Sequence, residues 1–157
     1  KANATRPEIE QILIRCEGGQ DAEAFERELY IIRRRIEKAA QAAGIAQLYL
    51  ASLSCRSIIY KGMMLAEQVA TFYPDLMDER FESAFAIYHQ RYSTNTFPQW
   101  WLAQPFRMLA HNGEINTLKG NVNWMKSHEI RMASNNFGEA AEDIKPIIPG
   151  GTSDSGA

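Results

Sequence analysis

Residues 91–96 read RYSTNT, and residues 111–117 read HNGEINT. Each stretch follows an apolar segment rich in β-forming residues, so each is expected to place polar groups at the end of a strand, where proteins often build sites. The guanidinium of Arg91 is a planar fork that matches a carboxylate. The pair Asn112 and Gly113 offers a side-chain amide and an unhindered backbone N–H that can point at one oxygen, which is the arrangement of an oxyanion hole.

The segments around these two stretches predict a mixture of helices and strands. Residues 22–43 are expected to form an amphipathic helix, because Phe25, Leu29, Ile32 and Ile36 recur at helical spacing. Asp21 is a suitable N-cap for it, and Gly44 is suited to end it. Helices are also expected near residues 65–72, stopped before Pro74, and over residues 118–132 with Asn116 or Thr117 as the cap.

Strands are expected in segments with alternating or β-branched composition, which are residues 11–15, 47–54, 56–60, 84–92 and 106–110. The second and third of these are expected to pair as a hairpin around Cys55. No regular βαβ rhythm is present, so the pattern favours the α+β class over a doubly wound parallel sheet.

Composition narrows the classes of function. The chain has 157 residues, a net charge of −2 and an isoelectric point near 6.0, which gives no electrostatic reason to expect nucleic acid. No apolar run is long enough for a membrane span, and no export leader precedes the first helix. The three histidines and two cysteines show neither metal-ligand spacing nor a disulfide framework. We therefore expect a cytoplasmic protein with no metal site in this chain.

The helix expected over residues 22–43 carries a run of basic residues. Arg33, Arg34, Arg35 and Lys38 all fall in the C-terminal half of the helix expected over residues 22–43. A basic run can mark an anionic partner. The interpretation favoured from sequence is a solvated helix face that also complements the helix dipole.

Four further stretches join the two above in a family resemblance, namely residues 60–63 (YKGM), 72–76 (FYPDL), 102–105 (LAQP) and 120–124 (GNVNW). Together they resemble the class II glutamine amidotransferases and, within these, the large subunits of glutamate synthases, most of all the bacterial NADPH-dependent type. The resemblance covers nearly the whole chain. It implies a four-layer αββα sandwich, the fold of the N-terminal nucleophile hydrolases. Trp101 departs from the family pattern, in which proline is commoner at that position.

The resemblance also implies roles for five residues in binding and cleaving L-glutamine. Arg91 and Thr94 would hold the α-carboxylate, Asp154 the α-ammonium, and Asn112 and Gly113 the oxyanion. Other interpretations stay open from the residues alone. Asn-Gly is a strong hairpin-turn signal, an arginine after a strand is often a surface ion pair, and Asp154 lies in a sequence suited to cap a helix.

The nucleophile that the resemblance implies is missing from the chain. In this family it is a cysteine at the mature N-terminus whose own α-amine acts as the base, whereas residue 1 here is Lys1 and both Cys16 and Cys55 are internal. We therefore expect residues 1–157 to be an internal piece of the amidotransferase domain, truncated at both ends and inactive alone. Cys55 is expected to be a structural thiol.

The resemblance further implies what the complete enzyme does. It would convert glutamine and 2-oxoglutarate to two glutamates, with FMN and an iron–sulfur cluster elsewhere in the large subunit and with FAD and NADPH on a small flavoprotein subunit. No cofactor site is expected in this segment, because it holds no glycine-rich dinucleotide motif and no cysteine cluster. The alternatives are another class II amidotransferase and a non-catalytic glutamine-binding module.

Overall fold

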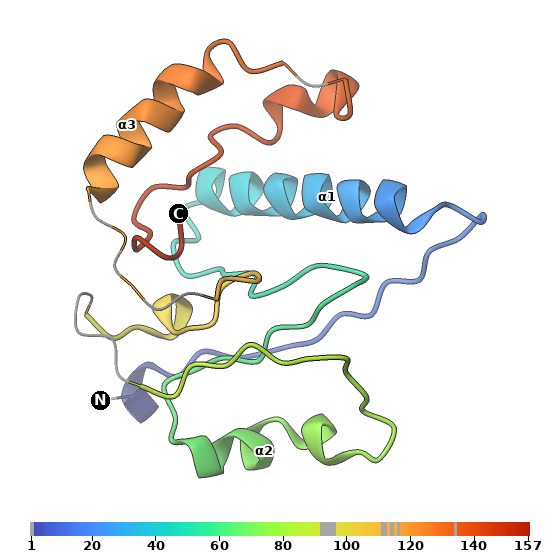
Figure 1. Ribbon diagram of the computed structural model, residues 1–157, viewed down its shortest axis with the longest axis vertical. Coiled ribbons are helices and arrows are strands. Elements are labelled where there is room, and N and C mark those ends of the chain that lie inside the picture. Colours follow the sequence, from blue (N-terminus) through green and yellow to red (C-terminus); the bar gives the residue numbers. More distant parts are fainter. Residues whose placement is uncertain (1, 92–96, 111–112, 114, 116, 134) are drawn as a thin grey trace. The chain divides into compact units, whose positions relative to one another are not determined.

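The computed structural model describes residues 2–91, 97–110, 113, 115, 117–133 and 135–157. Among these residues the α-helices are α1 (Ala22–Ala42), α2 (Val69–Phe72) and α3 (Leu118–Glu129), which are labelled in Figure 1. Short 3-10 helices span Ala2–Thr5, Ala66–Gln68, Pro74–Met77, Trp100–Leu102 and Gly138–Glu142. The chain divides into two compact units: the first joins Lys1–Ile9 to Ile59–Gly113, and the second joins Glu10–Ile58 to Glu114–Ala157.

Helix α1 forms where the sequence predicts it. At its start the Asp21 carboxylate accepts a hydrogen bond of 2.8 Å from the backbone N–H of Ala24, which satisfies one of the free donors of the first turn. At its end Gly44 has a left-handed backbone with a φ of 73°, a conformation that glycine adopts without a steric penalty. Leu29 is buried as expected from the helical spacing, whereas Ile36 is exposed.

The other two helices are also confirmed, with differences at their ends. The predicted helix near residues 65–72 is a 3-10 turn followed by α2, and Pro74 starts a new 3-10 turn directly afterwards. Helix α3 ends at Glu129, before Met132. Thr117 is its N-cap residue but makes no side-chain capping bond, and the alternative cap, Asn116, lies outside the described residues.

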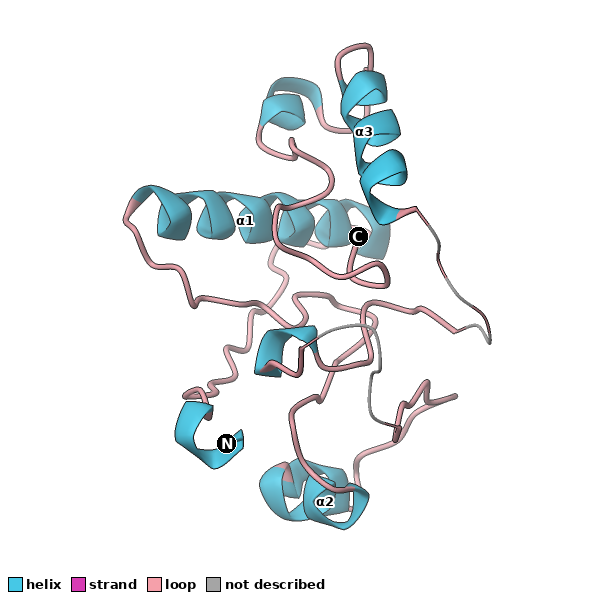
Figure 2. Cartoon of the chain, turned by 90° about the vertical axis from the view of Figure 1, so that its left-hand side faces the viewer, coloured by secondary structure: helices cyan, strands magenta, loops and turns pink. Residues whose placement is uncertain are grey.

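The predicted strands are wrong for this structure. Residues 11–15, 47–54, 56–60, 84–91 and 106–110 form no β-strand, and none occurs anywhere in the described part of the chain (Figure 2). A strand needs a ladder of backbone bonds to a neighbouring segment, which β-forming composition alone does not supply. Apolar side chains that a sheet would bury are therefore open to solvent, as for Leu13 at 96% exposure and Tyr88 at 83%. The α+β class is consequently not confirmed.

The first unit contains an aromatic cluster, defined here as Tyr60, Phe72, Tyr73, Phe81 and Trp100. Ring centroids lie 4.8 Å apart for Tyr60 and Tyr73, 5.0 Å for Phe72 and Tyr73, and 6.1 Å for Phe72 and Trp100. The Trp100 ring is buried, and its indole N–H donates to the backbone oxygen of Ala2 over 3.1 Å. Two of the stretches that carry the family resemblance, residues 60–63 and 72–76, thus pack against each other.

Candidate functional site

The five predicted site residues are divided between the two units. Arg91 and Gly113 belong to the first unit and are exposed, whereas Asp154 belongs to the second and is half-buried. Thr94 and Asn112 lie outside the described residues.

Arg91 follows an extended segment and has no ion-pair partner among the described residues. The surface ion pair that arginine commonly forms in this position is therefore not observed in that part of the chain. An exposed guanidinium of this kind presents its planar fork to a carboxylate arriving from solvent.

Asp154 lies in the C-terminal turn and is held by the residue that follows it. Its Oδ1 accepts hydrogen bonds from the backbone N–H of Ser155 at 2.8 Å and from the Ser155 hydroxyl at 3.2 Å. The preceding Ser153 is buried, and its backbone oxygen accepts from Gly156 and Ala157 at 3.1 Å each. Both bonds from Ser155 go to Oδ1, and no bond to Oδ2 is observed from the residues that the structure describes.

The backbone is strained on both sides of the HNG stretch. Met108 has a φ of 57° and Thr117 a φ of 62°, which places two residues with side chains in the left-handed region. For β-branched Thr117 this conformation is especially unfavourable. Such backbone strain tends to accumulate near functional sites, where the surrounding structure holds it in place.

Lys61 is a buried cation that the sequence analysis did not single out. Its ammonium donates to the backbone oxygen of Trp101 at 2.8 Å and lies 4.3 Å from the centroid of the Phe106 ring, while only 8% of the residue is exposed. Burial, together with the nearby charge of Arg107, lowers the pKa of Lys61 to about 7. Its own backbone oxygen accepts a bond of 2.7 Å from the Tyr73 hydroxyl. Lys61 thereby ties the aromatic cluster to the segment that leads toward Gly113.

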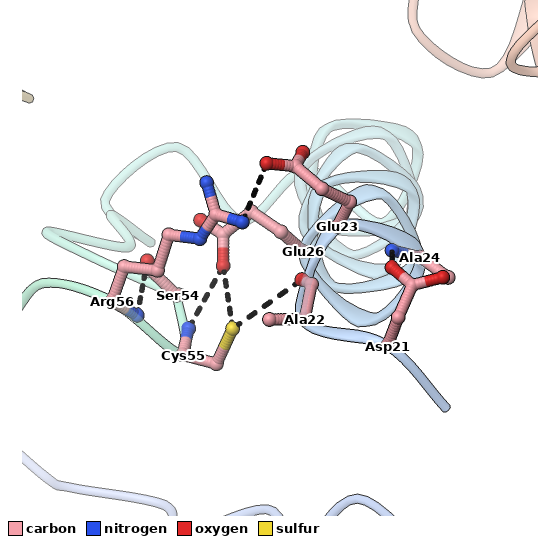
Figure 3. Close-up of polar contacts among 8 residues, drawn as sticks. All are labelled: Asp21, Ala22, Glu23, Ala24, Glu26, Ser54, Cys55 and Arg56. Atoms are coloured by element: carbon pink, nitrogen blue, oxygen red, sulfur yellow. Dashed lines mark hydrogen bonds and ion pairs between the residues drawn. The ribbon is translucent and has the colours of Figure 1, made fainter. Parts of the chain in front are cut away.

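Cys55 is exposed and makes polar contacts with the start of α1, and the structural role expected for it stays a prediction. Figure 3 shows its thiol beside α1, where Sγ lies 3.2 Å from Glu26 Oε2 and 3.7 Å from the backbone oxygen of Ala22. The backbone N–H of Cys55 also donates to Glu26 Oε2 at 2.9 Å. The hydrogen bond to the carboxylate of Glu26 raises the pKa of Cys55, so less thiolate is present. A thiol in this state is a poor nucleophile.

The basic run on α1 is only in part the solvated face that the sequence suggested, since Arg35 is exposed and Arg34 is buried. Arg34 is only 4% exposed, and its guanidinium joins Glu37 Oε2 at 2.5 Å to the backbone oxygen of Pro146 at 2.6 Å. Arg35 pairs with Asp143 Oδ2 at 2.7 Å, and Lys38 donates to the backbone oxygen of Glu142 at 2.6 Å. The solvated-face interpretation is therefore wrong for Arg34. Helical spacing alone could not reveal contacts that span more than a hundred residues of sequence.

The described residues show no other candidate site. They contain no group of three or more histidine, cysteine, aspartate or glutamate residues that could hold a metal ion. None of the helices in the part of the chain described is both long and apolar enough to cross a membrane. An open depression of about 270 Å³ at the end of α1 contains none of the predicted site residues and is lined by Glu37, Ala40, Gln41, Gly44, Ile45, Ala46 and Leu48.

Comparison with known proteins identifies relatives along the whole chain. A family model described as "Glutamine amidotransferases class-II" matches residues 1–157. The chain is 70% identical over 157 residues to the glutamate synthase [NADPH] large chain of Azospirillum brasilense, and 48% identical over 155 residues to that of Bacillus subtilis (strain 168). It is 49% identical over 155 residues to a chloroplastic ferredoxin-dependent glutamate synthase of Oryza sativa subsp. japonica.

The matches cover 98–100% of this chain but only 10% of each of these three relatives. The chain thus corresponds to about a tenth of their length. Because the family model matches every residue of it, the chain belongs to the class-II glutamine amidotransferases.

Proposed function

We propose that this chain is part of the glutaminase domain of a glutamate synthase large chain of the NADPH-dependent type. One observation carries the proposal: the match to the class-II amidotransferase family over all 157 residues, with 70% identity to an NADPH large chain. In this function the chain binds L-glutamine and stabilises the oxyanion that forms while its side-chain amide is cleaved to glutamate and ammonia.

Each site residue has a defined part in this function. The Arg91 fork binds the α-carboxylate of glutamine with help from the Thr94 hydroxyl, and Asp154 binds the α-ammonium. Holding both ends of the amino acid fixes its amide in position for attack. The Asn112 side-chain amide and the Gly113 backbone N–H then donate to the oxygen that becomes negative. The exposure of Arg91, and an Asp154 Oδ2 to which no described residue is observed to bond, support these assignments.

The nucleophile is proposed to be a cysteine upstream of Lys1, activated by its own α-amine. Residues 1–157 would then be part of the glutaminase domain and inactive alone. The raised pKa of Cys55 supports this proposal, because it leaves this internal thiol poorly suited to attack. In the complete domain the extended segments of this chain would pair with strands of other segments and build the four-layer αββα sandwich.

The complete enzyme is proposed to add the released ammonia to 2-oxoglutarate and so make a second glutamate. FMN and an iron–sulfur cluster in other parts of the large chain, and FAD and NADPH on a small flavoprotein subunit, would supply the electrons. The reaction would take place in the cytoplasm, without nucleic acid or membrane as a partner. These statements rest on the names of the relatives and on the family resemblance.

The direct test is the substitution Asn112→Ala in the full-length polypeptide that carries this sequence. We expect glutamine-dependent glutamate formation to fall by about 100- to 1000-fold, the usual effect of losing one oxyanion donor. Glutamate formation from added ammonia should stay within about twofold of the parent, since that step bypasses amide cleavage.

Asn123→Ala, on the exposed surface of α3, is the matched control and should change neither rate. Equal loss of both activities in Asn112→Ala would contradict the oxyanion assignment. A full-length polypeptide that binds glutamine but releases no ammonia from it would instead support a non-catalytic binding module.

A further inference from the structure

We propose that the basic side chains of α1 position the segment that carries Asp154, with Arg34 as the principal positioning residue. The clamp is defined here as Arg34, Arg35 and Lys38 together with their partners in residues 142–146. The inference rests on the proposed function, because it concerns the affinity of the same site for the ammonium group of the amino-acid substrate.

Three contacts join α1 to this segment. Arg34 Nη2 donates to the backbone oxygen of Pro146 at 2.6 Å, and Lys38 Nζ donates to the backbone oxygen of Glu142 at 2.6 Å. Arg35 reaches Asp143 Oδ2 with both Nε and Nη2, at 2.7 Å each. Two of the three partners are backbone oxygens, so the clamp fixes the path of the main chain and not only the position of side chains.

Arg34 has the strongest hold of the three. Its side chain is 5% exposed, against 62% for that of Arg35, so its bonds act where water screens little. One arm of its guanidinium is anchored by Glu37 on the same helix at 2.5 Å, and the other arm reaches Pro146. Glu37 also lies 3.6 Å from Arg33 Nε, which adds to the neutralisation of charge on this face of α1.

The clamped segment leads directly to Asp154. Ile144 within it is buried, and the backbone N–H of Ile147 donates to the carboxylate of Glu129 on α3. Eight residues after Pro146 the chain enters the turn held by the backbone oxygen of Ser153, where Asp154 accepts its bonds from Ser155. Arg34 and the neighbouring bond from Ile147 to Glu129 hold one end of the connection, and the turn at Ser153 holds the other. Releasing the first end should let the carboxylate of Asp154 move.

Geometry of this kind predicts an effect on substrate affinity rather than on the chemical step. A carboxylate that is displaced binds the α-ammonium less well, and a uniform loss of binding raises KM without lowering kcat. Glutamate formation from added ammonia does not require the α-ammonium of glutamine to bind at Asp154, so the rate of that reaction should not change.

The test compares variants in the full-length polypeptide. We expect Arg34→Gln to raise the KM for glutamine about tenfold, the effect of losing one charge-assisted bond, with kcat and the ammonia-dependent rate within twofold of the parent. Arg34→Lys keeps a cation that can reach the Pro146 oxygen and should restore the KM to within about threefold. Arg35→Gln, on the same helix but mostly exposed, is the matched control and should change the KM by less than twofold.

Asp154→Asn, measured in parallel, separates the two proposals. If it raises the KM and Arg34→Gln does not, the positioning role is wrong and the proposed function stands. If Asp154→Asn leaves the KM unchanged, the ammonium assignment fails and the positioning role fails with it.

A loss of both activities in Arg34→Gln would indicate global unfolding, and Lys38→Gln then decides. This variant removes only the bond to the Glu142 oxygen and should raise the KM about threefold with the ammonia-dependent rate intact. An unchanged KM in Lys38→Gln, or a fall in kcat at constant KM, would overturn the inference.

Discussion

The aromatic cluster and the clamp hold two parts of the chain by different physical means. The aromatic cluster packs apolar rings around Trp100 and has one buried cation, Lys61, at its edge. The clamp instead joins cations of α1 to backbone oxygens and to one carboxylate. Ring packing is non-directional and scales with buried area, whereas the clamp depends on charge and on exact atom positions.

Both regions come before proposed site residues in the sequence. Trp100 and Phe106 precede Gly113, and Pro146 precedes Asp154. We infer that the first region protects its segment against loss of fold, and that the second controls the position of one carboxylate. Variants in the two regions should therefore differ in what they change as well as in how much.

The largest effect is expected for Trp100→Ala. Removing the buried ring should lower the free energy of local unfolding of the first unit by about 3–5 kcal/mol, through lost burial and the cavity left behind. Hydrogen exchange of peptides from residues 59–77, measured in the full-length polypeptide, reports this change. Trp101→Ala is the matched control, because Trp101 is 40% exposed, and equal losses of protection in the two variants would contradict the cluster.

A somewhat smaller effect is expected for Arg34→Met. Loss of two charge-assisted bonds should reduce the free energy of local unfolding of residues 138–147 by about 2–3 kcal/mol. A larger loss is not expected, because the Glu37 carboxylate is near enough to the surface to be hydrated again. Hydrogen exchange should rise in these residues and stay constant in residues 59–77. Faster hydrogen exchange in residues 59–77 as well would show that the clamp and the aromatic cluster are not independent.

Gly62→Ala tests how tightly the aromatic cluster is packed. A Cβ at this position would lie 2.6 Å from Cζ3 of the Trp100 ring and 2.5 Å from Cε of Met64. We expect a loss of about 1–3 kcal/mol in the local stability of the first unit, the usual cost of overpacking. Gly150→Ala is the matched control, because a Cβ there would meet open space. Gly138 also has open space, but its positive φ would add backbone strain to an alanine. An unchanged exchange rate in Gly62→Ala would mean that the ring is free to shift.

Lys61 should make the stability of the first unit depend on pH. Its pKa is about 7 in the folded chain and 10.5 as the ordinary value, so between these values the unfolded state binds more protons. Stability should therefore rise with pH from about 7 to 10.5, by at most about 1.4 kcal/mol per pH unit. In Lys61→Met the stability of the first unit, measured by hydrogen exchange and corrected for the pH dependence of intrinsic exchange rates, should depend less on pH. The same pH dependence in Lys61→Met and the parent would contradict the burial of a titrating ammonium at Lys61.

The smallest effect is expected for Arg35→Ala at the exposed edge of the clamp. Its pair with Asp143 should contribute less than about 1 kcal/mol and should weaken further as salt screens it. Exchange of residues 138–147 at low and high ionic strength measures this. A large effect that persists at high salt would mean that Arg35, and not Arg34, is the main support.

How much of this could be predicted from sequence depends on the range of the contacts involved. Helix α1, its Asp21 cap and its Gly44 end are local features, and spacing and propensity predicted them to within one residue. The strands were not observed because pairing is non-local, and composition cannot say whether a partner segment is present. The burial of Arg34 was missed for the same reason, since its partner Pro146 lies 112 residues away.

The candidate site shows the same difference between what residue types predict and what only non-local contacts reveal. Residue types at Arg91, Asn112, Gly113 and Asp154 suggested the chemistry, and the family match shows the family while the roles of these residues stay predictions. Sequence gave no sign that Lys61 is buried against Phe106, because a lysine is normally exposed and only the fold brings the ring to it.

The most direct test of the central claim is an experimental structure of the full-length polypeptide with L-glutamate, the product of amide cleavage, bound. The account predicts that the Arg91 guanidinium and the Asp154 carboxylate contact the α-carboxylate and the α-ammonium respectively, at about 2.7–3.2 Å. It also predicts that the side-chain carboxylate of glutamate faces Asn112 and Gly113. Glutamate bound elsewhere, or bound with Arg91 pointing into solvent, would contradict the account.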